Sequence, residues 1–246
     1  MNKVGRMGQV VPSELPARAA GQHMHEIREI RILPVGLSGT LHVPKRAYAL
    51  VVFVHGSGSS RFSPRNRAVA DALNQQGVAT LLFDLLSERE EADRANVFNI
   101  SVLADRLVQV MDWLEREPDG RGLPLGLFGA STGAAAALVV AARLGKRVGA
   151  VVSRGGRPDL AGDALDQVRA PTLLIVGGND FGVIELNEQA FARLRGPKAL
   201  EIVPGASHLF PEPGALEAVI GHAQRWFRRH LGPGSSAPAE IVGRAT

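Results

Sequence analysis

The sequence predicts a doubly wound, mostly parallel α/β sheet of eight strands, flanked by helices and without a large cap domain. Short apolar runs alternate with longer stretches of helical period, as they do when helices connect the strands of one sheet. Several of these runs are apolar at every position, which is typical of strands that helices cover on both faces. The connections between parallel strands are expected to be right-handed.

The individual elements follow from these runs in chain order. An opening hairpin is expected over 27–33 and 37–43, because Pro34 and Gly36 separate two short runs. Buried strands are expected at 49–54, 79–83, 125–128, 148–152, 172–176 and 200–203. Helices are expected at 65–76, 97–117, 133–144, 160–167, 183–194 and 216–230. Ligands of such sheets bind beyond the carboxyl ends of the strands, so a site is expected in the loops there.

One domain is expected over residues 25–231, because no linker, repeat or low-complexity tract interrupts it. Residues 1–24 are expected to form a flexible N-terminal arm, since they contain glycines and prolines but no apolar period. Residues 232–246 are expected to form a flexible tail, since they open with turn and linker chemistry.

Composition excludes several function classes. The chain has no cysteine, so disulfides, thiolate metal sites, iron–sulfur clusters and a cysteine nucleophile are excluded. Lys and Arg exceed Asp and Glu by 28 − 24 = 4, but the cations are scattered apart from Arg225–His230, which ends a predicted helix. No nucleic-acid partner is expected, and no run is long enough for a membrane span. With no signal-peptide layout, the expected compartment is the cytoplasm. No cofactor or metal is expected, and the oligomeric state is left open.

The most informative segment is Gly129–Gly133, which fits G-x-S-x-G between a predicted strand and an alanine-rich helix. A serine at such a turn is held in a strained backbone, and small residues two before and two after it let strand and helix close tightly. Ser131 is therefore the candidate nucleophile. The alternative is a glycine-rich helix start in which Ser131 only caps the next turn.

A serine nucleophile needs a base and an acid that orients the base. Asp180 and His208 each follow a predicted strand, in the chain order Ser, Asp, His. The other histidines (His23, His25, His42, His222 and His230) fall in the arm, the hairpin or the last helix. Glu185 lies inside a predicted helix, and Asp84 precedes the nucleophile. A structural aspartate remains the alternative for Asp180.

Backbone donors for an oxyanion are expected after the strand at 49–54, in the glycine-containing loop His55–Ser60. The Ser57 and Thr132 N–H groups are the expected donors, with Gly58 as the substitute. His55 is expected to be structural. A phosphate-binding loop is disfavoured, because the Walker lysine and the full G-x-G-x-x-G spacing are absent.

Together, HGSGSS, GASTG, GGND and GASH resemble the α/β-hydrolase superfamily over about residues 27–231, and the short segment between Asp180 and His208 resembles its dienelactone hydrolase-like branch. Dienelactone hydrolases use a cysteine nucleophile, whereas this chain has Ser131. The resemblance therefore implies a serine hydrolase of small carboxylic esters, with anionic esters, lactones and thioesters left open, rather than a lactone-specific enzyme.

Alternatives and substrate features remain open from sequence. The alternatives are a non-catalytic binding module, an acyltransferase and a small-peptide hydrolase. Arg61, Arg65, Arg154 and Arg157 lie on the predicted rim, where they could clamp a substrate carboxylate or phosphate or could simply be solvated. Residues 87–99 are expected to cross the rim in place of a lid.

Overall fold

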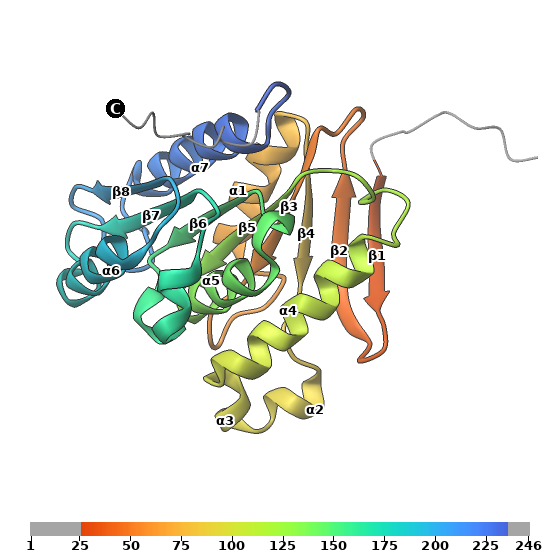
Figure 1. The fold of residues 1–246 in the computed structure, drawn as a ribbon, viewed down its shortest axis with the longest axis horizontal. Helices are drawn as coiled ribbons and strands as arrows, with labels where there is room; N and C mark the ends of the chain where they lie inside the picture. The colour runs from red at the N-terminus through yellow and green to blue at the C-terminus, as the bar shows by residue number, and fades with distance from the viewer. Residues whose placement is uncertain (1–25, 236–246) are drawn as a thin grey trace, which may run out of the picture.

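The computed structural model describes residues 26–235, whose strands form one eight-stranded sheet in the order β1-β2-β4-β3-β5-β6-β7-β8 (Figure 1). The β1–β2 and β2–β4 pairs are antiparallel, and all other neighbouring pairs are parallel. The strands are β1 (Glu26–Ile32), β2 (Leu37–Val43), β3 (Ala49–Val54), β4 (Val78–Phe83), β5 (Leu125–Ala130), β6 (Ala150–Arg154), β7 (Thr172–Gly177) and β8 (Lys198–Val203). The predicted mostly parallel, doubly wound sheet is confirmed.

Helices cover both faces of this sheet. The helical elements are α1 (Pro64–Gln75), α2 (Glu88–Glu91), α3 (Arg94–Val97), α4 (Ile100–Leu114), α5 (Thr132–Leu144), η1 (Gly145–Arg147), η2 (Pro158–Gln167), α6 (Phe181–Arg193) and α7 (Ala215–Leu231). α1 and α7 lie on one face, and α4, α5 and α6 lie on the other (Figure 1). The sheet is therefore the middle layer of three.

Two hydrophobic cores result, one on each face of the sheet, and β3 contributes to both. Leu50, Val52 and Val54 pack with α4 and α5, whereas the alternate residues, such as Val51 and Phe53, pack with α1 and α7. Successive side chains of a strand point to opposite faces, so a strand buried on both faces is apolar throughout.

The structure corrects several predicted boundaries. The helix expected at 97–117 is shorter at both ends: α4 starts at Ile100, where the Asn99 side chain accepts from the Val102 N–H, and it ends at Leu114. The helix expected at 160–167 is a 3₁₀ segment broken at Gly162, whose φ is +56°. The strand expected at 148–152 is displaced to β6, so Arg154 is the last residue of a strand rather than a loop residue.

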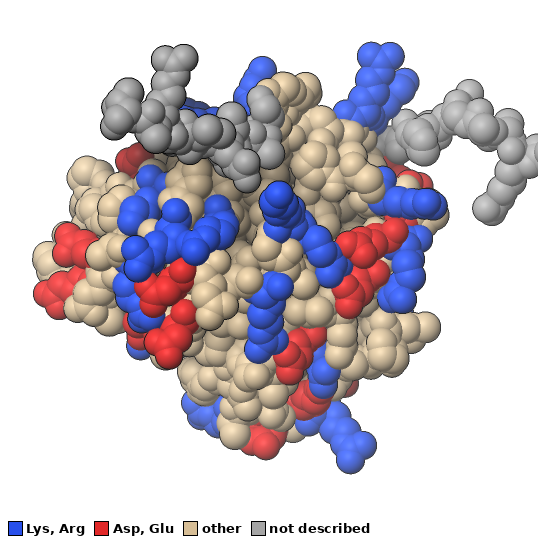
Figure 2. Space-filling view, in the orientation of Figure 1, with Lys and Arg blue, Asp and Glu red and all other residues tan. Residues whose placement is uncertain are grey.

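The predicted arm, residues 1–24, lies outside the described residues, as does the tail after residue 235. Within residues 26–235, no helix has both the length and the apolar character that crossing a bilayer requires. Positive and negative side chains are interleaved on the face seen in Figure 2. Ion pairs within the described residues include Arg193–Asp166 and Arg147–Asp112.

Candidate functional site

Ser131 lies in a sharp turn between β5 and α5, at the carboxyl end of the sheet. Its φ is +50° and its ψ is −123°, a conformation that a residue with a Cβ rarely adopts. Such strain persists only where the surroundings impose it, and it concentrates at functional sites. The Ser131 side chain makes no capping hydrogen bond to α5. Ser131 thus stands at the N-cap position of α5, but its side chain is not used to cap the helix.

Two glycines allow this turn to close. A Cβ on Gly129 would lie 2.4 Å from the Ala134 Cα, and a Cβ on Gly133 would lie 2.2 Å from the Val54 carbonyl oxygen. Both contacts are with backbone atoms, which cannot move aside. The sequence argument that small residues must flank the serine at these two positions is therefore supported.

Asp180 and His208 lie beyond β7 and β8 and are joined by a hydrogen bond of 2.7 Å between His208 Nδ1 and Asp180 Oδ2. Asp180 stands at the start of α6, but its side chain does not cap the helix. The aspartate is mostly buried and the imidazole is about one-third exposed. The Asp180 carboxylate thus accepts a hydrogen bond from the His208 imidazole and does not cap α6.

The segment after β6 connects the serine to this pair. The Ser131 N–H donates to the Arg154 carbonyl at 3.3 Å, and the Arg157 N–H donates to the Ser131 carbonyl at 3.0 Å. On the other side of the segment, a Cβ on Gly155 would lie 3.6 Å from His208 Cε1. Ser131 and His208 therefore contact the same short segment at one edge of the sheet.

The competing residues lie elsewhere. His42 is on β2 and bonds to Asn74. His222 and His230 are on α7, where His222 lies 3.8 Å from Glu201 and the His230 ring packs on Trp226. His23 and His25 lie outside the described residues. Asp84 accepts hydrogen bonds from the backbone and guanidinium of Arg61, so it is committed to that side chain.

The loop after β3 lies against the serine, as the oxyanion-hole prediction requires. A Cβ on Gly56 would lie 2.9 Å from Ser131 Cβ. As the first residue of α5, Thr132 has an N–H that no carbonyl of its own helix can reach. The Ser57 N–H, by contrast, donates to the Thr132 hydroxyl at 2.9 Å. Sequence reasoning did not foresee this contact, although a hydroxyl directly after the serine was a visible signal for it.

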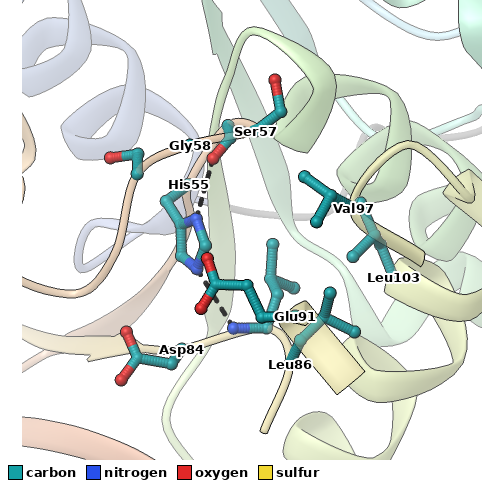
Figure 3. A pocket seen from close by; sticks show the side chains of 11 residues that line it. His55, Ser57, Gly58, Asp84, Leu86, Glu91, Val97 and Leu103 are labelled. Atoms are coloured by element: carbon teal, nitrogen blue, oxygen red, sulfur yellow. Dashed lines mark hydrogen bonds between the residues drawn. The ribbon is translucent and has the colours of Figure 1, made fainter. Parts of the chain in front are cut away.

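His55 fastens this loop to the end of β4 (Figure 3). Its Nδ1 bonds to the Gly56 carbonyl at 2.9 Å, and its Nε2 accepts from the Leu85 N–H at 3.1 Å. Both contacts are satisfied only by a neutral ring with the proton on Nδ1. Burial lowers the pKa of His55, which favours that form. The predicted structural role of His55 agrees with this geometry.

A narrow pocket of about 20 Å³ opens beside this loop (Figure 3). Residues from the β3 and β4 loops and from α2, α3 and α4 line it: His55–Ser59, Asp84–Leu86, Glu91, Val97 and Leu103. The residues of α2 and α3 belong to the segment 87–99, which was expected to cross the rim. Its pocket-lining residues were not predicted, because they come from elements far apart in sequence.

The four rim arginines separate into two kinds. Arg61 pairs with Asp84, and Arg157 pairs with Asp159 through two hydrogen bonds of 2.9 and 2.7 Å. Within residues 26–235, no carboxylate pairs with Arg154 or Arg65. The four side chains thus do not form a single clamp.

In the described part of the chain, no three His, Asp or Glu side chains are grouped so that they could hold a metal ion. The groups present at this edge are the hydroxyl, imidazole, carboxylate, backbone N–H and guanidinium groups described above.

Comparison with known proteins places this arrangement in a family. Residues 47–218 match the family model described as an alpha/beta hydrolase domain. A curated protein from two strains of Mycobacterium tuberculosis, named "Putative phosphoribosyl transferase", is 60% identical over 204 residues. The match covers 82% of this chain, and the chain spans about half (46%) of that relative.

Solved structures agree. The crystal structure of a dienelactone hydrolase from Anabaena variabilis is 53% identical, with a TM-score of 0.82, and the match covers 85% of this chain and all of that one. Est1E from Butyrivibrio proteoclasticus is similar in fold at 17% identity, with a TM-score of 0.70 and coverage of 83% and 99%. The chain belongs to the α/β-hydrolase family and has a dienelactone hydrolase-like fold.

Proposed function

We propose that this protein is a serine hydrolase that cleaves small carboxylic esters through an acyl-enzyme. The observation that carries the proposal is the 2.7 Å Asp180–His208 hydrogen bond, held against the same segment that fixes the strained Ser131 turn. A serine hydroxyl is a weak nucleophile unless a base takes its proton, and an oriented imidazole is such a base.

In the first half of the reaction, His208 Nε2 takes the Ser131 proton as Oγ attacks the ester carbonyl. Asp180 accepts from Nδ1–H, so it selects the tautomer with a free Nε2 and stabilises the imidazolium. The imidazolium then protonates the leaving alcohol. Water, activated by the same imidazole, attacks the acyl-enzyme and releases the acid.

The oxyanion of each tetrahedral intermediate is assigned to the Thr132 N–H and the Ser57 N–H, with Gly58 as the substitute. In the structure, the Ser57 N–H donates to the Thr132 hydroxyl. This bond holds the loop close to the serine, and the Ser57 N–H must share or exchange it when the oxyanion forms.

The pocket beside the loop is proposed to receive the leaving alcohol of the ester. Leu86, Val97 and Leu103 give it apolar walls, and it opens next to the proposed oxyanion donors. The pocket itself is narrow, so the larger part of the leaving alcohol would lie in the open groove beside it, which Ser57, Gly58, Val97 and Phe98 line.

The transferase name of the curated relatives describes proteins about twice as long as the region they share with this chain. The segment that matches the hydrolase model, residues 47–218, contains Ser131, Asp180 and His208. These residues support hydrolysis, and the similarity to a dienelactone hydrolase at 53% identity supports an ester substrate. An acyltransferase, a small-peptide hydrolase and a binding module are the alternatives.

The test is the Ser131→Ala substitution in the full chain. We expect the rate of p-nitrophenyl acetate hydrolysis to fall by about 10⁴-fold or more, and covalent labelling by a fluorophosphonate to disappear. Ser101→Ala, an exposed serine on α4, is the matched control and should retain both.

Circular dichroism and the melting temperature should show that Ser131→Ala is folded. Labelling that persists in Ser131→Ala would overturn the assignment of the nucleophile. A folded wild-type protein with neither ester hydrolysis nor labelling would favour the binding module.

A further inference from the structure

Arg154 is a buried cation on the α1-facing side of the sheet, beside the candidate site. It is the last residue of β6, and its side chain is only 6% exposed. Its Nη2 donates to the Asn66 side-chain oxygen at 3.4 Å, in the first turn of α1. The guanidinium also lies 6.0 Å from the ring centre of Phe210, two residues after His208.

Among the described residues, the positive charge of Arg154 has no counter-charge. Within residues 26–235, no Asp or Glu forms an ion pair with it, and its Nε lacks a hydrogen-bond partner. Arg65, in the first turn of α1, also has a buried Nε without a partner. The N-terminus of α1, where both side chains meet, adds the partial positive charge of a helix start. The guanidinium groups of Arg154 and Arg65 and the N-terminus of α1 thus lie together, and no carboxylate of the described residues pairs with either guanidinium.

This arrangement is costly for a purely structural residue. Burying an unpaired charge costs several kcal/mol, and an apolar residue of the same size would fill the space without that cost. Burial, and then repulsion from Arg65, lowers the pKa of Arg154 to about 10. The side chain therefore remains cationic at neutral pH and retains its capacity to bind an anion.

Arg154 is also directly attached to the proposed catalytic groups. Its carbonyl accepts from the Ser131 N–H, and the next residue, Gly155, lies against the His208 backbone and ring. An anion held by this guanidinium would belong to the molecule that reacts at Ser131. The leaving-alcohol pocket lies by the β3 loop, so the opposite, acyl end of the ester is the part that would extend toward Arg154.

We propose that Arg154 and Arg65 bind a carboxylate or phosphate group on the acyl portion of the substrate, so that the enzyme prefers anionic esters. This inference rests on the proposed ester hydrolysis. It narrows the four rim arginines of the sequence analysis to two, because Arg61 and Arg157 already have carboxylate partners.

The experiment compares p-nitrophenyl hemisuccinate with p-nitrophenyl butyrate, which share a leaving group and differ in a terminal carboxylate. The ratio of their kcat/KM values, anionic over neutral, is the readout. We expect Arg154→Met to lower this ratio by about 10- to 100-fold, because a charged hydrogen-bond partner is lost, while the butyrate value changes about twofold or less. Arg65→Gln should lower it by a smaller factor.

Arg143→Gln, which removes a guanidinium from a surface ion pair with Asp105, is the matched control and should leave the ratio unchanged. The melting temperature separates binding from a structural role. Arg154→Met should melt at the wild-type temperature or above it, because an unpaired buried charge is removed. The proposal would be overturned if Arg154→Met melted at a clearly lower temperature than the wild type and Arg65→Gln left the kcat/KM ratio unchanged.

A second measurement tests anion binding without any ester hydrolysis. Inorganic phosphate and succinate are each added to Ser131→Ala and to Ser131→Ala/Arg154→Met, and the melting temperature is measured. A rise in the melting temperature of Ser131→Ala but not of Ser131→Ala/Arg154→Met supports the proposal. The anion that gives the larger rise shows whether the site prefers phosphate or carboxylate. No stabilisation by either anion, with an equal ester ratio in wild type and Arg154→Met, overturns it. A wild-type protein that hydrolyses neither ester would instead contradict the proposed function.

Discussion

The two flanks of Ser131 differ in how their charges are neutralised. On the α2–α4 flank, two partly buried arginines have carboxylate partners: Arg61 pairs with Asp84, and Arg106 pairs with Glu90. On the α1 flank, Arg154 and Arg65 have none within the described residues. The first flank contains an apolar pocket with carboxylates at its edge, and the second contains buried positive charge.

This difference indicates which arginines have a structural role. A guanidinium that fixes a loop is neutralised by a carboxylate in the same molecule, as Arg61 is by Asp84 at the end of β4. A buried guanidinium without a carboxylate partner keeps part of its desolvation cost, which an anion from another molecule would offset. The two flanks are thus proposed to hold opposite ends of one ester.

The largest effect on this comparison should come from filling the pocket. Val97→Trp places a large side chain against the pocket wall, so we expect kcat/KM for p-nitrophenyl acetate to fall about tenfold. Vinyl acetate has a much smaller alcohol portion, so its kcat/KM should change about twofold or less. Equal losses for both esters would show that the pocket does not receive the leaving alcohol.

A smaller effect, on the free energy of unfolding, should come from replacing the paired Arg106. Burial alone would raise the pKa of Glu90, but hydrogen bonds from Arg106 and Ser87 lower it to about 2 from an ordinary 4.5. A lowered carboxylate pKa stabilises the fold above pH 4.5, and that stability is lost as pH falls toward 2. Arg106→Gln should therefore lower the free energy of unfolding by about 1 kcal/mol at pH 7, for this partly exposed pair.

Urea unfolding at pH 7 and at pH 3 measures this. The difference between Arg106→Gln and wild type should shrink at the lower pH, whereas Arg154→Met should show no loss of stability at pH 7. If both substitutions destabilise the protein equally, the distinction between paired and unpaired arginines is wrong.

The smallest effect is expected at the edge of the pocket. Glu91 is exposed and points toward His55 across the pocket (Figure 3). Its carboxylate repels an anionic substrate through a mostly aqueous path, so Glu91→Gln should raise kcat/KM for p-nitrophenyl hemisuccinate about twofold. The value for p-nitrophenyl butyrate should not change. A gain shared by both esters would contradict an electrostatic origin.

Much of the fold could be predicted because its signals are local. The run 49–54 gives β3 with the predicted boundaries, and 37–43 gives β2. The Gly129–Gly133 turn could be placed because a strained serine between a strand and a helix requires small neighbours. The Asp180–His208 contact followed from topology, since the carboxyl ends of parallel strands meet at one edge.

Other features could not be predicted, because they depend on contacts between segments distant in sequence. The helix expected at 97–117 starts only at Ile100, after the Asn99 cap, and a separate short helix, α3, ends at Val97. The Ser57–Thr132 hydrogen bond joins residues 75 positions apart. The division of the rim arginines depends on partners such as Asp84 for Arg61, which no local pattern identifies.

The sequence by itself determined the alternation of strands and helices, the position of the strained serine and the order of the three candidate catalytic residues, because hydrophobic period and backbone sterics act over a few neighbouring residues. Only the tertiary structure decided which charges are neutralised and which remain unpaired. Electrostatic pairing depends on distance in space and on exclusion of water, and both are fixed only when β6, α1 and the loop containing His208 pack together.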